Sequence, residues 1–237
     1  MPDDPDESFV IDTLLRGRRG CSTRPVSAAD AGVPLFAPGD DAAMVAKDMA
    51  ITVDTMVEGV HWDDRMSASD VGWKLVAANA SDINAMAGIP TWGLLSIALP
   101  APLDRAWVSD FAQGLGDALS AWTIDLVGGD TTRSTGARMV SLTLAGRVPR
   151  PIGRNGAKPG QTLWVSGPLG GPAAGFFSDC PHPDALEALR RPHPPIGLGA
   201  ALSETGAIGA MMDLSDGLAR DLPRLCSASD VGAVVDP

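Results

Sequence analysis

The alternation of apolar and polar positions predicts one long helix most clearly, over residues 68–87. Ser67-Ala68-Ser69-Asp70 has the form of a capping box, and Gly88 followed by Pro90 is expected to end the helix. An apolar stripe runs along one side of it through Val71, Leu75, Ala78 and Met86. Asp82 falls on this stripe, where a carboxylate is costly unless it is paired or coordinated.

The rest of the chain alternates between strand-like and helix-like segments. Strands are expected at residues 42–46, 50–54, 92–99, 123–127, 138–148, 162–166 and 210–214, with another beginning at 231, and helices at 6–19, 104–122, 183–191, 197–205 and from 217. A glycine-rich turn is expected after residue 166. This alternation is typical of an α/β or α+β protein. Because Pro149-Arg150-Pro151 interrupts it, we predict an N-terminal domain at 1–149 and a C-terminal domain at 150–237.

Composition narrows the class of protein. The 237 residues are 45% hydrophobic, which is ample for a buried core. There is no uninterrupted apolar run of the roughly 18 residues that a membrane span needs, and the first residues are acidic where a signal peptide would be basic. We therefore expect a cytoplasmic protein without membrane partners. The net charge of -11 argues against nucleic acid, and the three scattered cysteines support neither a disulfide framework nor a zinc site.

Five short acidic motifs carry the candidate chemistry. They are Gly39-Asp40-Asp41-Ala42, Asp54 to His61, Asn79-Ala80-Ser81-Asp82, Gly128-Gly129-Asp130-Thr131-Thr132 and Asp213-Leu214-Ser215-Asp216-Gly217. Carboxylates gathered in one cleft raise one another's pKa values unless a cation neutralises them. Mg²⁺ takes oxygen ligands and is usually held by a few carboxylates together with substrate phosphates. The motifs therefore predict a Mg²⁺-dependent phosphoryl-transfer enzyme.

Each motif has a plainer alternative when it is taken alone. Gly128-Gly129-Asp130 lets a phosphate approach the backbone closely, but an ordinary turn after a strand has the same letters. A strand would place Asp213 and Ser215 on one face, with Asp216 either a ligand or the N-cap of the next helix. His61 is either a donor to phosphate or a surface histidine.

Taken in order, the motifs resemble the thiamine-monophosphate kinases, and the resemblance runs from about residue 30 to the end. These enzymes make thiamine diphosphate from thiamine monophosphate and ATP. The stretches that carry the resemblance are Asp54 to His61, Lys74 to Met86, Gly128 to Arg133 and Asp213 to Asp221. It implies the two-domain fold of the aminoimidazole ribonucleotide synthetase group, with an N-terminal mixed sheet that pairs with a second subunit and a C-terminal α+β domain. A homodimer follows.

The resemblance also assigns roles to residues by position. Asp41, Asp54, Asp82, Asp130 and Asp213 match Mg²⁺ ligands, Asp216 matches a ligand of a further ion, and Thr52 offers a hydroxyl ligand. Val53 stands where the family often has threonine, so a ligand there would be its backbone carbonyl. Gly129, Asp130, Arg154 and Ser215 match contacts with ATP, and His61 matches a contact with the acceptor substrate. The aspartates are expected to act as ligands, since an acceptor phosphate that is already anionic needs no acid, base or protein nucleophile.

Two other interpretations stay open. The family's downstream Gly-Gly-Glu-Asp-Tyr stretch does not occur before Pro237, so we expect an incomplete C-terminal domain and weak closure over the thiamine end. One alternative is a related synthetase that makes aminoimidazole ribonucleotide or selenophosphate, although Cys21 does not lie in the glycine-rich setting of the latter. The other is a non-catalytic module that binds Mg-nucleotide and dimerises.

Overall fold

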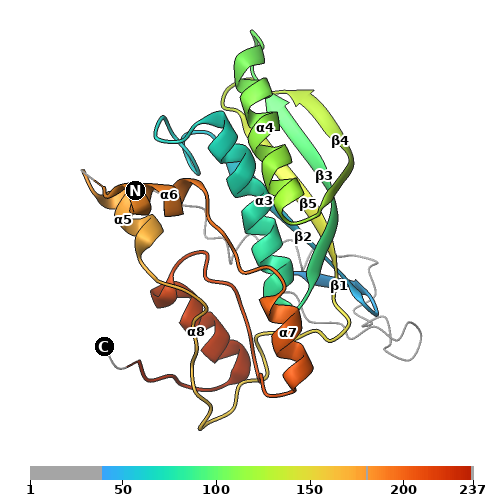
Figure 1. The fold of residues 1–237 in the computed structure, drawn as a ribbon, viewed down its shortest axis with the longest axis vertical. Coiled ribbons are helices and arrows are strands. Elements are labelled where there is room, and N and C mark those ends of the chain that lie inside the picture. The colour runs from blue at the N-terminus through green and yellow to red at the C-terminus, as the bar shows by residue number, and fades with distance from the viewer. Residues whose placement is uncertain (1–38, 180, 236–237) are drawn as a thin grey trace.

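A five-stranded mixed sheet forms the framework of the computed structural model, which describes residues 39–179 and 181–235 (Figure 1). The strands lie in the order β1-β2-β5-β3-β4, and only β3 and β4 pair in parallel. Their bounds are Ala43–Ala46 for β1, Met49–Val57 for β2, Ile89–Leu99 for β3, Asp125–Arg133 for β4 and Met139–Arg147 for β5. The α/β class is confirmed, and the predicted helix at 6–19 lies outside the described residues.

Helix α3, Ala68–Ala85, covers one face of the sheet and packs on β2, β5 and β3. Its capping box forms as predicted, since Ser67 Oγ accepts from Asp70 N at 3.1 Å and Asp70 Oδ2 accepts from Ser67 N at 3.1 Å. The C-terminal end of α3 differs from the prediction. Ala87, with φ 65°, takes the left-handed conformation after the helix that was expected of Gly88. Gly88 is needed for space, as a Cβ there would lie 2.7 Å from Val148 Cγ2.

Helix α4, Arg105–Ala121, packs against α3 at a very short backbone separation. A Cβ on Gly114 would lie 1.9 Å from the carbonyl oxygen of Ser69, and one on Gly72 would lie 2.4 Å from that of Phe111. Two glycines therefore allow the crossing of α3 and α4, and this crossing holds α3 in place over the sheet.

Replacing Gly114 with alanine should lower the free energy of unfolding by about 3 kcal/mol or more, because a backbone carbonyl cannot move aside as a side chain can. Gly116→Ala is the matched control on the same helix, since a Cβ there meets nothing within 4 Å. That control should stabilise the protein by up to about 1 kcal/mol through helix propensity. Urea unfolding of both variants measures the difference, and equal stabilities would contradict the close crossing.

The edge strand β4 departs from the expected buried strand at 123–127. It runs on to Arg133, and all nine of its residues are exposed. Gly128 and Gly129 therefore lie inside a strand and not in a turn that follows one. Gly129 is required there by close packing, because a Cβ would lie 1.9 Å from the carbonyl oxygen of Leu95 on β3. Within the described chain, the sheet thus ends on this side in a long strand whose outer edge is unpaired.

Residues 149–235 contribute helices beside α3, on the side opposite β4 (Figure 1). They are α5 at Gly171–Phe177, α6 at Pro183–Arg190, α7 at Leu198–Thr205 and α8 at Leu218–Ser229, of which only α5 was not predicted. The predicted strands at 162–166 and 210–214 are wrong, and residues 231–235 are not a strand either. An apolar run forms a strand only where another strand can pair with it, and none lies beside these segments in the described chain. The domain boundary at 149–150 stays a prediction.

Among the described helices, none combines the length and the apolar character needed to cross a bilayer.

Candidate metal and nucleotide site

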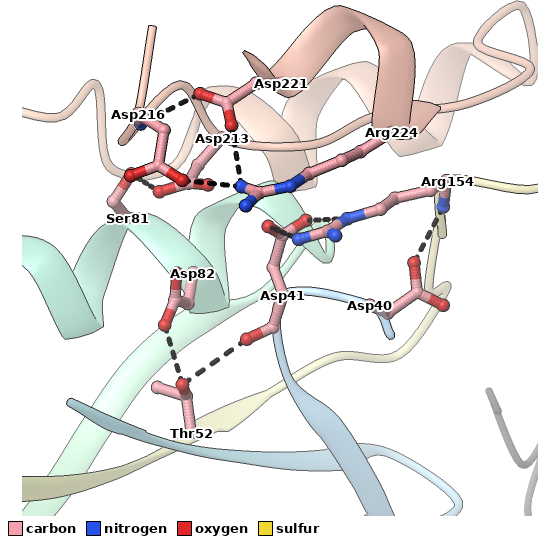
Figure 2. A network of polar contacts seen from close by, with 10 residues as sticks. All are labelled: Asp40, Asp41, Thr52, Ser81, Asp82, Arg154, Asp213, Asp216, Asp221 and Arg224. Atoms are coloured by element: carbon pink, nitrogen blue, oxygen red, sulfur yellow. Dashed lines mark hydrogen bonds and ion pairs between the residues drawn. The ribbon is translucent and has the colours of Figure 1, made fainter. Parts of the chain in front are cut away.

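Three carboxylates from distant parts of the chain meet at one point (Figure 2). Asp41 precedes β1, Asp82 lies near the end of α3, and Asp213 lies in the segment between α7 and α8. One carboxylate oxygen from each lies within 4.8 Å of the other two. Since these are three of the predicted metal ligands, the structure brings together residues that are 172 positions apart in the sequence.

Hydroxyl groups hold two of these carboxylates in place. Thr52 on β2 donates from Oγ1 to Asp82 Oδ2 at 2.6 Å, and the same oxygen lies 3.3 Å from the carbonyl oxygen of Asp41. Ser81 Oγ donates to Asp213 Oδ2 at 3.3 Å. The predicted ligand Thr52 therefore lies in the cluster, and Ser81 is a neighbour for which the sequence prediction had no role. Figure 2 shows these side chains converging from α3, β2 and the segment before α8.

Arg154 supplies the positive charge at the cluster. Its Nη2 forms an ion pair with Asp41 Oδ1, and its Nε donates to Asp41 Oδ2 at 3.4 Å. The Asp41 side chain is only 1% exposed in this arrangement. Asp40 fixes the backbone of the arginine, because its Oδ1 accepts from Arg154 N at 2.8 Å. Arg154, a predicted ATP contact, thus lies directly against Asp41, a predicted metal ligand.

Among the described residues, no cation forms an ion pair with Asp82 or Asp213, the other two carboxylates of the cluster. Burial, together with the charges of Asp54 and Asp213, raises the pKa of Asp82 to about 9. Burial and the charge of Asp41 raise the pKa of Asp213 to about 7. Burial also raises the pKa of Asp54. These carboxyl groups are thus poorly neutralised by the protein itself, and a divalent cation would favour their ionised forms.

The donor set fits a hard cation such as Mg²⁺. Every group in the cluster offers oxygen, from carboxylates, a threonine hydroxyl and a backbone carbonyl, and no histidine or cysteine belongs to it in the described chain. Asp41, Asp82 and Asp213 would hold the ion, which would draw phosphate oxygens to the site and neutralise their charge.

The raised pKa values predict that the metal-free protein loses stability as pH rises. Between the ordinary carboxyl pKa of 3.8 and about 9, folded Asp82 keeps a proton that the unfolded chain has released, so the free energy of unfolding falls across this range. The loss should amount to a few kcal/mol, because each unit of pKa difference is worth about 1.4 kcal/mol. Urea unfolding with chelator at pH 5 and pH 8 measures it.

Excess Mg²⁺ should reverse this dependence, since the ion binds the ionised cluster more strongly at pH 8. The Asp82→Asn variant is the control, because it cannot release this proton and should show a flatter pH profile. A metal-free protein that is more stable at pH 8 than at pH 5 would contradict the electrostatics of the cluster.

Asp54 lies further along β2, and His61 lies in the loop after this strand. The backbone amide of Asp54 donates to Asn79 Oδ1 at 3.2 Å, and buried Asn79 in turn donates to the carbonyl oxygen of Leu75 at 2.8 Å. His61 is exposed, and its Nδ1 accepts from Val57 N at 3.0 Å. Its charge acts to lower the pKa of Asp54, against the larger effect of burial, so the two side chains are within electrostatic reach. Asn79 is a positioning residue whose role the sequence prediction missed.

A second acidic group lies at the start of α8. Arg224 Nη1 contacts Asp216 Oδ2 at 2.7 Å and Asp221 Oδ1 at 3.0 Å, and Asp221 Oδ2 accepts from Asp216 N at 2.9 Å (Figure 2). Gly217 is the N-cap, so Asp216 precedes the helix and does not cap it. Fully buried Asp221 was not predicted as a site residue, although a lone aspartate in the first turn of an amphipathic helix was a usable signal.

Four predicted site residues lie away from the cluster. The Val53 side chain is 60% exposed on the other face of the sheet, so only its backbone could serve as a ligand. Ser215 is exposed beside Asp216. Gly129 and Asp130 lie on β4, which is separated from β2 by β5 and β3 and so lies about 14 Å away at the usual strand spacing. Their roles as ligands or ATP contacts stay predictions.

Known proteins resemble this chain both in sequence and in structure. Residues 39–148 match the family described as AIR synthase related protein, N-terminal domain. Thiamine-monophosphate kinase of Mycobacterium tuberculosis (strain H37Rv) is 38% identical over 235 residues, which are 95% of this chain and 67% of the relative. The enzyme of the same name from Escherichia coli K12 is 38% identical over 213 residues. That match takes in 84% of this chain but only 64% of the relative's length.

Among solved structures, AaThiL complexed with AMPPCP and TMP superimposes with a TM-score of 0.78 and 28% identity. The match takes in 94% of this chain and 70% of the other.

Proposed function

The chain belongs to the family of thiamine-monophosphate kinases, and on this basis we propose that it binds Mg-ATP and serves the transfer of the γ-phosphate to thiamine monophosphate. The products are thiamine diphosphate and ADP. The observation that carries the proposal is the cluster of Asp41, Asp82 and Asp213 with Arg154 beside it. The similar AaThiL structure holds AMPPCP, an analogue of ATP, together with TMP, which supports the same pair of substrates here.

Transfer of a phosphoryl group between two phosphates requires charge neutralisation more than acid or base catalysis. Both reacting groups are phosphates, so two polyanions must be brought into line, and the attacking oxygen is already anionic at neutral pH. Asp41, Asp82 and Asp213 would hold Mg²⁺, which neutralises the triphosphate. Arg154 adds a fixed positive charge, and Asp40 holds the backbone of this arginine in place. The aspartates act as ligands in this scheme, and none is placed as a nucleophile.

The test has two stages, of which the first is binding. Mg-ATP should raise the melting temperature, whereas ATP with chelator should not, because the bare carboxylates repel the triphosphate. Equal stabilisation with and without chelator would contradict a metal-dependent site.

The second stage is turnover, measured as ADP release by the 237-residue chain with thiamine monophosphate, thiamine or inorganic phosphate as the acceptor. ADP release that depends on thiamine monophosphate supports the kinase. Mg-ATP binding without ADP release for any acceptor would instead support a nucleotide-binding module.

We also propose that the sheet of one chain pairs with that of a second copy. The face of the sheet opposite α3 is uncovered in the described chain and exposes Val53, Leu94 and Met139, which are 60%, 41% and 42% accessible. Beside this face, all of β4 is exposed, and a long exposed edge strand is commonly covered by another chain. A homodimer would cover both surfaces. Analytical ultracentrifugation would measure the oligomeric state.

A further inference from the structure

The backbone of Arg154 is held on both sides by side chains from other parts of the chain. Its N–H group donates to Asp40 Oδ1 at 2.8 Å, and its carbonyl oxygen accepts from Ser229 Oγ at 2.5 Å. Ser229 is the last residue of α8 and lies 75 positions later in the sequence. From this backbone the side chain of Arg154 reaches Asp41 (Figure 2). The place of the guanidinium therefore depends on a contact with the C-terminal end of α8.

The hydroxyl of Ser229 also accepts a hydrogen bond from the turn that carries Arg154. Its Oγ accepts from Ala157 N at 3.0 Å, so one hydroxyl joins the carbonyl of Arg154 to the amide three residues later. In a four-residue turn these two groups often bond each other directly. Here the hydroxyl bridges them, which it can do because a hydroxyl both donates and accepts. It thus fixes the turn and ties it to α8.

The turn also lies against the segment that leads to Asp213. A Cβ on Gly156, inside the turn, would lie 2.0 Å from the carbonyl oxygen of Gly209. The glycine therefore allows the two segments to come this close. Because the turn of Arg154 is packed between this segment and the end of α8, a shift of the turn would move the guanidinium relative to Asp41.

The N-terminal end of α8 contacts the same part of the site. Asp221 in the first turn of the helix is fully buried and accepts from Asp216 N at 2.9 Å. Asp213 lies three residues before Asp216, in the segment that leads into α8. One helix of 12 residues thus holds the segment of a predicted metal ligand at its first turn and the turn of the arginine at its last residue.

We propose that Ser229 is a positioning residue for Arg154, and that its hydroxyl keeps the guanidinium in place to contact the phosphates of Mg-ATP. This inference rests on the proposed function, in which Arg154 supplies a fixed positive charge. Such a charge is most effective when it is held in position before the substrate binds. Without the hydroxyl, binding would have to order the turn as well, and that ordering lowers the affinity. Ser229 acts only through Arg154.

The test compares Ser229→Ala, which removes the hydroxyl, with Ser229→Thr, which keeps it. Ser227→Ala is the matched control, because Ser227 is exposed on the same helix. The first measurement is NMR of the Arg154 Nε–H group in the metal-free protein, with Arg154→Lys to assign its signal. This group donates to Asp41 Oδ2, so its proton should exchange with water several-fold faster in Ser229→Ala. Ser229→Thr should stay close to the unaltered chain, and Ser227→Ala should not differ from it.

The second measurement is isothermal titration of Mg-ATP. Binding should be about fivefold weaker in Ser229→Ala, the effect of losing about one hydrogen bond, and largely retained in Ser229→Thr. In an Arg154→Lys background, Ser229→Ala should have a much smaller further effect, because lysine lacks the two-point contact with Asp41. Arg154→Lys keeps a positive charge beside Asp41, so we expect it to fold. Ser229→Cys, which bonds only weakly, replaces the alanine variant if the latter does not fold.

Two results would overturn the inference. One is proton exchange at Arg154 Nε that does not change in Ser229→Ala. The other is an equal loss of Mg-ATP affinity from Ser229→Ala in the unaltered and the Arg154→Lys backgrounds, which would show a general structural effect. If the unaltered chain does not bind Mg-ATP, the proposed function fails, but the NMR measurement needs no nucleotide and still decides whether Ser229 positions Arg154.

Discussion

Replacing Asp82 with asparagine should weaken the binding of Mg-ATP by about 1–3 kcal/mol, the cost of removing a charged partner from a site. It should do so without unfolding the protein. Asparagine keeps an oxygen that accepts the 2.6 Å hydrogen bond from Thr52 Oγ1. The pKa of about 9 means that Asp82 is largely protonated at neutral pH without metal, so a neutral amide resembles the group that is already present.

The measurement is isothermal titration of Mg-ATP together with the melting temperature of the metal-free protein. Asp117→Asn is the matched control, because it removes the same charge from an exposed position on α4 where Gln113 Nε2 can still donate to it. The control should bind Mg-ATP as the unaltered chain does. If Asp82→Asn lowers the melting temperature but leaves the nucleotide affinity unchanged, Asp82 is only a structural partner of Thr52.

The sequence predicted most of the elements that build the site, because their signals are local. The capping box at Ser67 marks the start of α3, and the apolar stripe marks the face that places Asp82 toward β2. The strand at residues 138–148 was recognised from its own residues and is confirmed as β5. A carboxylate on the apolar face of a helix is buried, and its burial requires a partner. The local pattern alone therefore marked Asp82 as a candidate site residue.

The sequence was least informative where structure depends on partners distant in the chain. Residues 162–166 and 210–214 have the composition of strands, but composition does not supply a neighbouring strand. The pairing of Arg154 with Asp41, and of its backbone with Asp40, joins positions more than 100 residues apart, and no local pattern encodes it. Asn79 was inside a recognised motif, yet its role became clear only through its contact with Asp54 on another element.

Asp130 is the predicted ligand whose position most needs explanation. Its Cα pairs with that of Ser96, which pairs with Ser141, which pairs with Thr55 on β2. Residues in such a row share one face of a sheet, and Thr55 is exposed, while its neighbour Met56 is buried on the face toward α3. Asp130 therefore lies on the uncovered face, about 14 Å from β2. Within one chain it cannot join Asp41, Asp82 and Asp213.

If Asp130 is a ligand, a second copy of the chain must supply it, which the proposed dimer would allow. Asp130→Asn and Asp82→Asn homodimers should then both bind Mg-ATP weakly. In a mixed dimer, one site combines the intact cluster of the first chain with the intact Asp130 of the second. Random mixing should restore full affinity to about a quarter of the sites, because half of the dimers are mixed and each has one intact site.

Co-refolding the two variants and titrating Mg-ATP gives the fraction of restored sites, with Asp125→Asn as the control for an exposed aspartate on the same strand. The Asp125→Asn homodimer should bind normally by itself. If mixing restores nothing while Asp130→Asn is impaired, Asp130 acts within its own chain and β4 must move toward the cluster. If Asp130→Asn binds Mg-ATP normally, Asp130 is not a ligand, and the tight packing of Gly129 against Leu95 becomes the reason for the glycines of this strand.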